Sequence, residues 1–345
     1  LDHAKAAAAL EQVLSLDPTR ADSARELGRH YRSLEKFVEL SELYQTQIDK
    51  SSDDKRRVES ALSLGRLLAS ELSAPQRAIE AYELVLTLEP GHKAALDALA
   101  TLRATAGDSE SALDAIEALA DAAKTPKERA EQYLRAAALL EQQGDLEASI
   151  GQLKRAIDAF PEDGAARAKL KSKYVVMGNF AGVVELLDEE LENAKGDHQR
   201  AKLAGQIAVL CQRHLQDNER ANSMAQLAFH LDPTEPGALR VLGKFAYDDG
   251  RFVESAKRLE PVISVLEGME VSEAADVARL YIEALVKAGS AEKAMVMIEG
   301  LRPFFADDTR ALLTVAELAS KHDAPEQTYA LTQDLLQRLG PSLGL

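Results

Sequence analysis

The chain has 345 residues, of which 46% are hydrophobic and 28% charged, as is ordinary for soluble proteins. Its formal net charge of −16 opposes binding to bare nucleic acid or to an anionic membrane, because contact with phosphates needs a basic surface. The single cysteine excludes an internal disulfide, and no apolar run reaches the roughly 18 residues that predict a membrane span.

One sequence pattern returns along the chain and sets the expected elements. Four related segments end in proline, namely LEQVLSLDP at Pro18, YELVLTLEP at Pro90, LKRAIDAFP at Pro161 and AQLAFHLDP at Pro233. The intervals between these prolines are 72, 71 and 72 residues. Such a regular spacing over most of the chain predicts a repeat array, in which each unit packs only on its neighbours.

The period from Pro90 to Pro161 predicts four helices. Apolar residues recur at helical spacing over residues 92–107, 111–123, 129–143 and 146–160. The turn GDSE separates the first two helices, with Asp108 or Ser109 placed to cap the second. Each period therefore holds two helix hairpins. No segment alternates as a strand would, and an irregular helical bundle is the alternative that the in-phase prolines disfavour.

Residues 130–163 resemble a tetratricopeptide repeat. Tyr133 stands where that repeat favours an aromatic residue, Gly144 at its inter-helix turn, Ala156 at the small position of its second helix and Pro161 at its closing proline. Two further segments match, SARELGRHY through Leu27, Gly28 and Tyr31, and LRVLGKFAYDDGRF through Leu242, Gly243, Gly250 and Phe252. The resemblance extends over nearly the whole chain, and the Ala- and Leu-rich, Trp-free composition resembles bacterial members of the family.

The resemblance implies an all-α fold, a right-handed superhelical solenoid of antiparallel helix hairpins with about nineteen helices. We expect one solenoid over residues 1–345, with a leading half-repeat at 1–18. Its hairpins are expected at about 19–54, 55–90, 91–125, 126–161, 162–196, 197–233, 234–268, 270–305 and 306–340. The chain starts at Leu1 without Met and already in helical pattern, so we expect a piece of a larger protein. A cytoplasmic location is expected, although a signal could lie upstream.

The repeat register slips near the C-terminus. Gly289 at a turn places the expected closing proline near position 306, but the actual proline is Pro303. Pro261 falls inside a predicted second helix, and should kink that helix or end it near Glu260.

No Walker loop, GxGxxG, HExxH or CxxC motif is present. Cys211 and His214 lie three residues apart on one predicted helix, but a zinc site needs three or four ligands. We interpret them as a small buried cysteine beside a surface histidine, and the carboxylates of residues 188–192 as a solvated helix face. The sequence therefore predicts no enzyme, no metal site and no cofactor.

Basic residues are more informative than acidic ones. Arg25, Arg29 and Arg32 share one helix face, which by resemblance points into the concave groove of a tetratricopeptide array. The matching positions of later hairpins are Arg66, Arg240, Lys244 and Tyr247. These clusters predict a groove for an acidic or C-terminal carboxylate segment of another protein. The alternative is that they pair with Asp and Glu on neighbouring helices.

The middle hairpins offer a different groove surface. Apart from one carboxylate, their matching positions are small or neutral, and they are Asp97, Thr101, Leu134, Ala138, Ala168 and Ser172. Such a surface suits an apolar helix or an extended segment.

Together these features predict a non-catalytic protein–protein interaction scaffold. Its partner would be another protein, with no nucleic acid and no membrane insertion, and with further domains of the same larger protein. A self-associating structural array is the alternative, because the leading apolar helix would seek a partner at its end or edge. The net charge disfavours a nucleic-acid-binding array.

Overall fold

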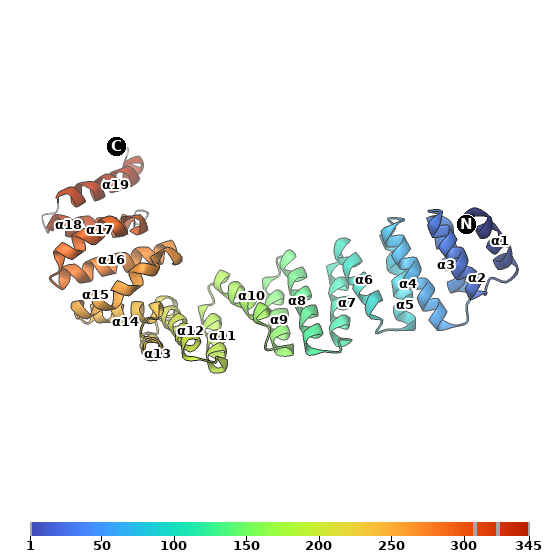
Figure 1. Cartoon of the computed structure of the whole chain (residues 1–345), viewed down its shortest axis with the longest axis horizontal. Coiled ribbons are helices and arrows are strands. Elements are labelled where there is room, and N and C mark those ends of the chain that lie inside the picture. Colours follow the sequence, from blue (N-terminus) through green and yellow to red (C-terminus); the bar gives the residue numbers. More distant parts are fainter. Residues whose placement is uncertain (1, 306–308, 322–324, 344–345) are drawn as a thin grey trace. The chain divides into compact units, whose positions relative to one another are not determined.

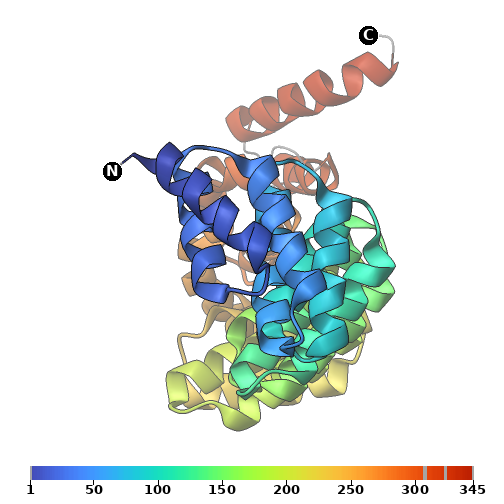
Figure 2. The same cartoon turned by 90° about the vertical axis from the view of Figure 1, so that its right-hand side faces the viewer.

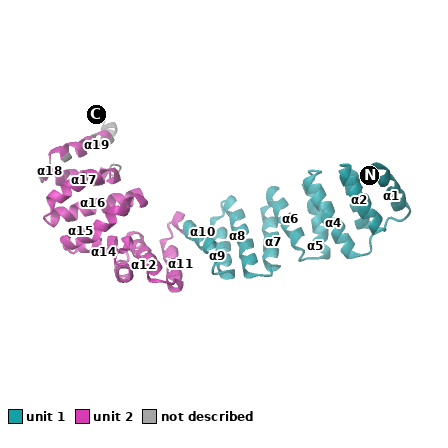
Figure 3. Cartoon of the chain, viewed as in Figure 1, with its two compact units in different colours: residues 1–173 teal, residues 174–345 magenta. Residues whose placement is uncertain are grey.

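The computed structural model describes residues 2–305, 309–321 and 325–343, and every regular element in those ranges is a helix. The chain divides into two compact units, residues 1–173 and residues 174–345 (Figure 3). Nineteen α-helices lie in the described ranges, so the expected all-α fold and number of helices are confirmed. None of the described helices has the length and apolar character that crossing a membrane requires.

Unit 1 is a stack of antiparallel helix hairpins in which α1 is the outermost helix (Figures 1 and 2). Its elements are α1 (His3–Leu16), α2 (Ala21–Ser33), α3 (Phe37–Lys50), α4 (Asp54–Ser70), α5 (Pro75–Leu88), α6 (Lys93–Thr105), α7 (Ser109–Asp121), α8 (Pro126–Gln142), α9 (Leu146–Ala159) and most of α10 (Gly164–Val176).

Unit 2 repeats the hairpin arrangement with two irregular helices inserted. Its elements are α11 (Phe180–Asn193), α12 (Asp197–Leu210), a π-helix η1 (Cys211–Leu215), α13 (Asn218–Leu231), α14 (Pro236–Asp248), α15 (Phe252–Leu259), a 3₁₀-helix η2 (Glu260–Gly268), α16 (Val271–Lys287), α17 (Ala291–Phe305), α18 (Thr309–Lys321) and α19 (Pro325–Leu343).

The recurring prolines end four helices by the same local mechanism. Helices α1, α5, α9 and α13 all end two residues before Pro18, Pro90, Pro161 or Pro233. The intervening residue is extended in each case, with φ between −134° and −145° and ψ between 82° and 101°. A proline disfavours helical backbone in the residue before it, so each helix has to stop there.

The predicted caps and breaks of individual helices are confirmed where the structure describes them. The Asp108 carboxylate caps α7 by accepting a hydrogen bond of 3.3 Å from the Ser111 backbone N–H. Pro261 ends α15, because regular α-helix stops at Leu259 and continues only as the 3₁₀-helix η2. Pro303, in contrast, lies inside α17, which runs on to Phe305, and the expected closing position 306 falls outside the described residues.

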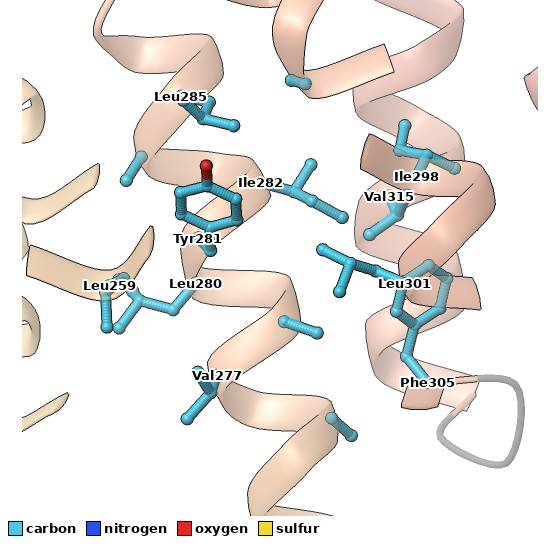
Figure 4. Close-up of a cluster of buried hydrophobic side chains, with 14 of the residues drawn as sticks. Leu259, Val277, Leu280, Tyr281, Ile282, Leu285, Ile298, Leu301, Phe305 and Val315 are labelled. Carbon is cyan, nitrogen blue, oxygen red and sulfur yellow. The ribbon is translucent and has the colours of Figure 1, made fainter. Parts of the chain in front are cut away.

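Alanine, leucine and other small or aliphatic side chains form the core of each unit. In unit 2, Tyr281 and Ile282 of α16 are fully buried between Leu259 of α15 and the side chains of α17 and α18 (Figure 4). A single hairpin cannot bury such a two-sided apolar face, so the hairpins are stable only when stacked.

Glycines inside helices allow neighbouring helices to approach closely. A Cβ at Gly65 of α4 would lie 2.7 Å from the ring of Tyr82 on α5. A Cβ at Gly243 of α14 would lie 2.8 Å from Leu259 of α15 in the same way. Both glycines are buried, so the aromatic or branched side chain opposite occupies the volume that any other residue would need.

Substituting Gly65 tests this close packing. Gly65→Ala is expected to lower the free energy of unfolding by about 1–3 kcal/mol, because the buried Tyr82 ring has to shift. Gly151→Ala is the matched control, since Gly151 lies in α9 with open space around it, and it should raise stability by up to about 1 kcal/mol. Urea unfolding followed by circular dichroism measures both free energies, and a Gly65→Ala protein as stable as its parent would contradict the packing account.

Candidate protein-binding grooves

Helices α2, α3 and α4 of unit 1 enclose a groove of about 600 Å³, here called the α2–α4 groove. Its lining includes all four basic residues predicted in this part of the chain, Arg25, Arg29 and Arg32 from α2 and Arg66 from α4. The aromatic rings of Phe37 and Tyr44 on α3 supply apolar lining between them. The structure therefore brings these four predicted residues together on one surface.

The internal partners of these arginines are weak or absent. Arg25 pairs with Asp22 at 2.5 Å and Arg29 with Glu26 at 3.0 Å, one helical turn away. The side chains of both arginines remain more than 70% exposed, so these pairs contribute little. Arg32 has no ion pair with any described residue, and the same is true of Arg66.

A second hollow continues the α2–α4 groove along the same three helices and shares Arg25, Tyr44 and Glu59 with it. Together the two hollows are lined by seven basic and four acidic side chains. These are Arg20, Arg25, Arg29, Arg32, Lys55, Arg56 and Arg66, with Asp22, Asp53, Glu59 and Glu71. The surface is therefore locally basic in a chain whose net charge is −16.

Elsewhere in the two units, charged side chains pair across successive first helices of hairpins. Arg135 of α8 pairs with Asp97 of α6 at 2.6 Å and also donates to the Thr101 hydroxyl at 2.8 Å. Lys173 of α10 pairs in the same way with Glu141 of α8. Among the described residues, no ion pair joins α2 to α4. Among the described residues, none of the four groove arginines therefore forms an ion pair with a carboxylate of another hairpin, although Glu59 and Glu71 of α4 also line the groove.

Unit 2 has a comparable hollow of about 730 Å³ between η1, α14 and α16, here called the α14–α16 groove. Arg240 and Lys244, two of the predicted residues, line it together with Arg213 and Arg279. Its apolar lining residues are Phe245, Val277 and Leu280.

The deepest cations of the α14–α16 groove share one carboxylate. Arg240 lies 3.1 Å from Glu273 of α16, and Arg213 pairs with the same carboxylate oxygen. Only 12% of the Arg240 side chain is exposed. Burial, followed by repulsion from Arg213, lowers the pKa of Arg240 to about 10, so the guanidinium is still charged at neutral pH.

The other predicted residues of unit 2 are also paired inside the unit. Lys244 lies 2.5 Å from Asp248 on its own helix. The Tyr247 hydroxyl donates to Glu283 at 2.5 Å and accepts from Lys287 at 2.6 Å. Burial, and after it the hydrogen bond to Glu283, raises the pKa of the Tyr247 hydroxyl. Internal pairing, which the sequence left open as the alternative, is what the structure shows for these residues of unit 2.

The middle of unit 1 is more polar than the sequence indicated. Asp97 and Thr101 occupy groove positions, but both are engaged by Arg135, which the sequence analysis did not single out. The sequence does contain a signal for this pair, because Arg135 and Asp97 are 38 residues apart, close to one hairpin length.

Cys211 and His214 do not form a site. Cys211 is fully buried, and burial raises the pKa of its thiol. His214 is exposed and stacks on the Phe180 ring with a centroid distance of 3.6 Å. Both lie on the π-helix η1 rather than on regular α-helix, and η1 ends where Gln216 takes a left-handed conformation and the Asp217 N–H bonds back to the Cys211 carbonyl. In the described part of the chain, no cluster of three or more metal-ligating side chains occurs.

Residues 98–164 match the family model of the tetratricopeptide repeat. This stretch runs from within α6 to the first residue of α10, and hairpins of the same kind continue on both sides of it. These residues form tetratricopeptide repeats, and proteins of this family and fold are generally non-catalytic scaffolds for protein–protein interaction. A search of curated protein sequences found no match.

Solved structures with similar folds share little sequence with the chain. A crystal structure of MamA is 19% identical, covers 48% of this chain and 93% of its own, and gives a TM-score of 0.35. The APC/C hetero-tetramer Cut9–Hcn1 is 11% identical over 96% of this chain and 89% of that one, with a TM-score of 0.44. The C-terminal part of a repeat protein from Cytophaga hutchinsonii is 14% identical over 73% and 98%, with a TM-score of 0.42.

The shared carboxylate of unit 2 can be tested by removing it. Glu273→Gln leaves the buried Arg240 without an ion pair and Arg213 with only the distant Glu270, and we expect the free energy of unfolding to fall by about 2 kcal/mol or more. Glu270→Gln is the control, because Glu270 is 73% exposed and lies 3.9 Å from Arg213, and it should change stability by less than about 0.5 kcal/mol. Urea unfolding followed by circular dichroism decides, and a Glu273→Gln protein as stable as its parent would rule out this role.

Proposed function

We propose that the chain is a non-catalytic scaffold that binds an acidic segment of another protein in the α2–α4 groove of unit 1. The observation that carries this proposal is the set of four arginines there, none of which forms an ion pair with another hairpin among the described residues. Exposed pairs such as Arg25–Asp22 exchange easily for a partner's carboxylate, because they contribute little on their own.

The chemistry of the groove supports an acidic peptide rather than an apolar one. Guanidinium groups bind carboxylates through two parallel hydrogen bonds, and several of them along one surface favour a segment with several carboxylates. The rings of Phe37 and Tyr44 offer apolar contact for side chains between those carboxylates. Because the scaffold is already ordered, little conformational entropy is lost on its side when the segment binds.

The remaining predicted residues, which lie in unit 2, are not proposed as contacts for the acidic segment. Arg240, Lys244 and Tyr247 are held by Glu273, Asp248 and Glu283. A partner would have to displace those carboxylates to reach them, and this costs more than the exchange of an exposed pair in unit 1.

Charge reversal in the α2–α4 groove tests the proposal. Arg32→Glu with Arg66→Glu removes two cations that have no ion pair among the described residues, so the fold should be retained. We expect the affinity for a fluorescent poly-glutamate peptide to fall by about tenfold or more. Fluorescence anisotropy at low ionic strength measures this, and added salt should weaken the parent's binding.

Arg77→Glu with Lys127→Glu is the matched control, because it changes the net charge equally with two exposed residues that line neither hollow. The control should bind within about twofold of the parent. If the groove variant and the control lose the same affinity, binding follows the net charge of the chain and the α2–α4 groove is not the site.

A further inference from the structure

The hairpins around the two grooves are equivalent. Helices α2 and α14 are both 13 residues long, and Gly28 and Gly243 occupy the same buried position in them. Helices α4 and α16 are both 17 residues long, and aligning their first residues superimposes their buried positions. The matched core pairs are Val58 with Ala275, Ala61 with Ala278, Leu64 with Tyr281 and Leu68 with Leu285.

At matched positions on the groove surface, some charges are the same in the two units and others have the opposite sign. Arg25 and Arg29 of α2 correspond to Arg240 and Lys244 of α14, so the basic first helix is kept. The opposing helix differs, because Arg56 and Arg66 of α4 correspond to Glu273 and Glu283 of α16.

The two carboxylates of α16 engage the polar groups of the α14–α16 groove. Glu273 pairs with Arg213 and Arg240, and Glu283 accepts hydrogen bonds from Arg279 at 2.8 Å and from Tyr247 at 2.5 Å. The Arg279 side chain also lies 3.3 Å from Asp276. The cations that would attract an acidic segment are thus already neutralised by the helix that stands where α4 stands in unit 1.

We propose that Glu273 and Glu283 exclude acidic segments from the α14–α16 groove, so that the chain binds such a segment only in unit 1. This inference rests on the proposed function of the α2–α4 groove. It means that Glu273 and Glu283 of α16 determine which of the two equivalent grooves an acidic segment binds. Each guanidinium that lines the α14–α16 groove already has a carboxylate partner, and an incoming carboxylate would also be repelled by Glu273, Glu283 and Asp276.

The stoichiometry of peptide binding tests this assignment. Isothermal titration with a poly-glutamate peptide should give one bound peptide per parent chain and none for Arg32→Glu with Arg66→Glu. Glu273→Gln with Glu283→Gln should add a second binding step, because it releases Arg240 and leaves Arg213 and Arg279 with one weaker ion pair each. Adding Arg240→Gln to that variant should weaken the second step by about tenfold or more, while the first step is unchanged.

A milder pair of substitutions covers the case in which the double glutamine variant fails to fold. Asp248→Asn with Asp276→Asn removes carboxylates whose side chains are 48% and 58% exposed, so no buried charge is left unpaired. It releases Lys244 and partly releases Arg279 but keeps Glu273 and Glu283, so no second binding step is expected. Circular dichroism checks that each variant is folded.

Three results would overturn the inference. They are two equivalent peptides bound by the parent chain, a second peptide bound by the Asp248→Asn, Asp276→Asn variant, or only one peptide bound by the folded double glutamine variant. The proposed function fails separately. If the parent binds no peptide while the double glutamine variant binds one, the α2–α4 site is wrong and the neutralisation of unit 2 stands.

Discussion

The pairing of charges across successive hairpins is the interaction on which the surface chemistry of both units depends. Stacking places the first helix of one hairpin beside the first helix of the next, so a groove side chain faces residues about one hairpin further along the chain. The observed partners are accordingly separated by 32 to 38 residues, as in Lys173–Glu141, Tyr247–Glu283 and Arg135–Asp97. Whether a groove position is engaged therefore depends on its neighbour in the array as well as on its own helix.

The sequence predicts the helices well because their signals are local. A proline removes helical backbone from the residue before it, and this effect acts wherever the residue stands, so the ends of α1, α5, α9 and α13 could be placed in advance. Pro261 ends α15 differently, because Glu260 before it stays helical (φ −53°, ψ −46°) while the proline has no N–H for the next α-helical hydrogen bond. Pro303 shows the limit, since packing of Leu301 and Phe305 in the core keeps α17 helical on both sides of it. The π-helix at residues 211–215 carries no Pro or Gly and could not be predicted.

The candidate site was predictable only in part, because its charges act between hairpins. Helical spacing alone places Arg25, Arg29 and Arg32 on one face, and the period adds Arg66 from the next first helix. The same reasoning placed Arg240 and Lys244 together in unit 2, but it did not indicate that Glu273 would engage one of them. Applying the hairpin length to acidic residues as well as basic ones identifies that partner, and it identifies Arg135 opposite Asp97.

The two grooves show how a repeat array separates its fold from its binding surface. Stacking requires small or aliphatic residues on the buried face, and these recur at matched positions of α4 and α16, as Ala61 and Ala278 do. The groove face of the same helices is under no such constraint, since its side chains contact solvent and the next first helix. A change from Arg66 to Glu283 at matched positions therefore leaves the hairpin intact while it reverses the charge presented to a ligand. Because stacking and binding use different faces of one helix, equivalent hairpins in one chain can differ in what they bind without differing in how they fold.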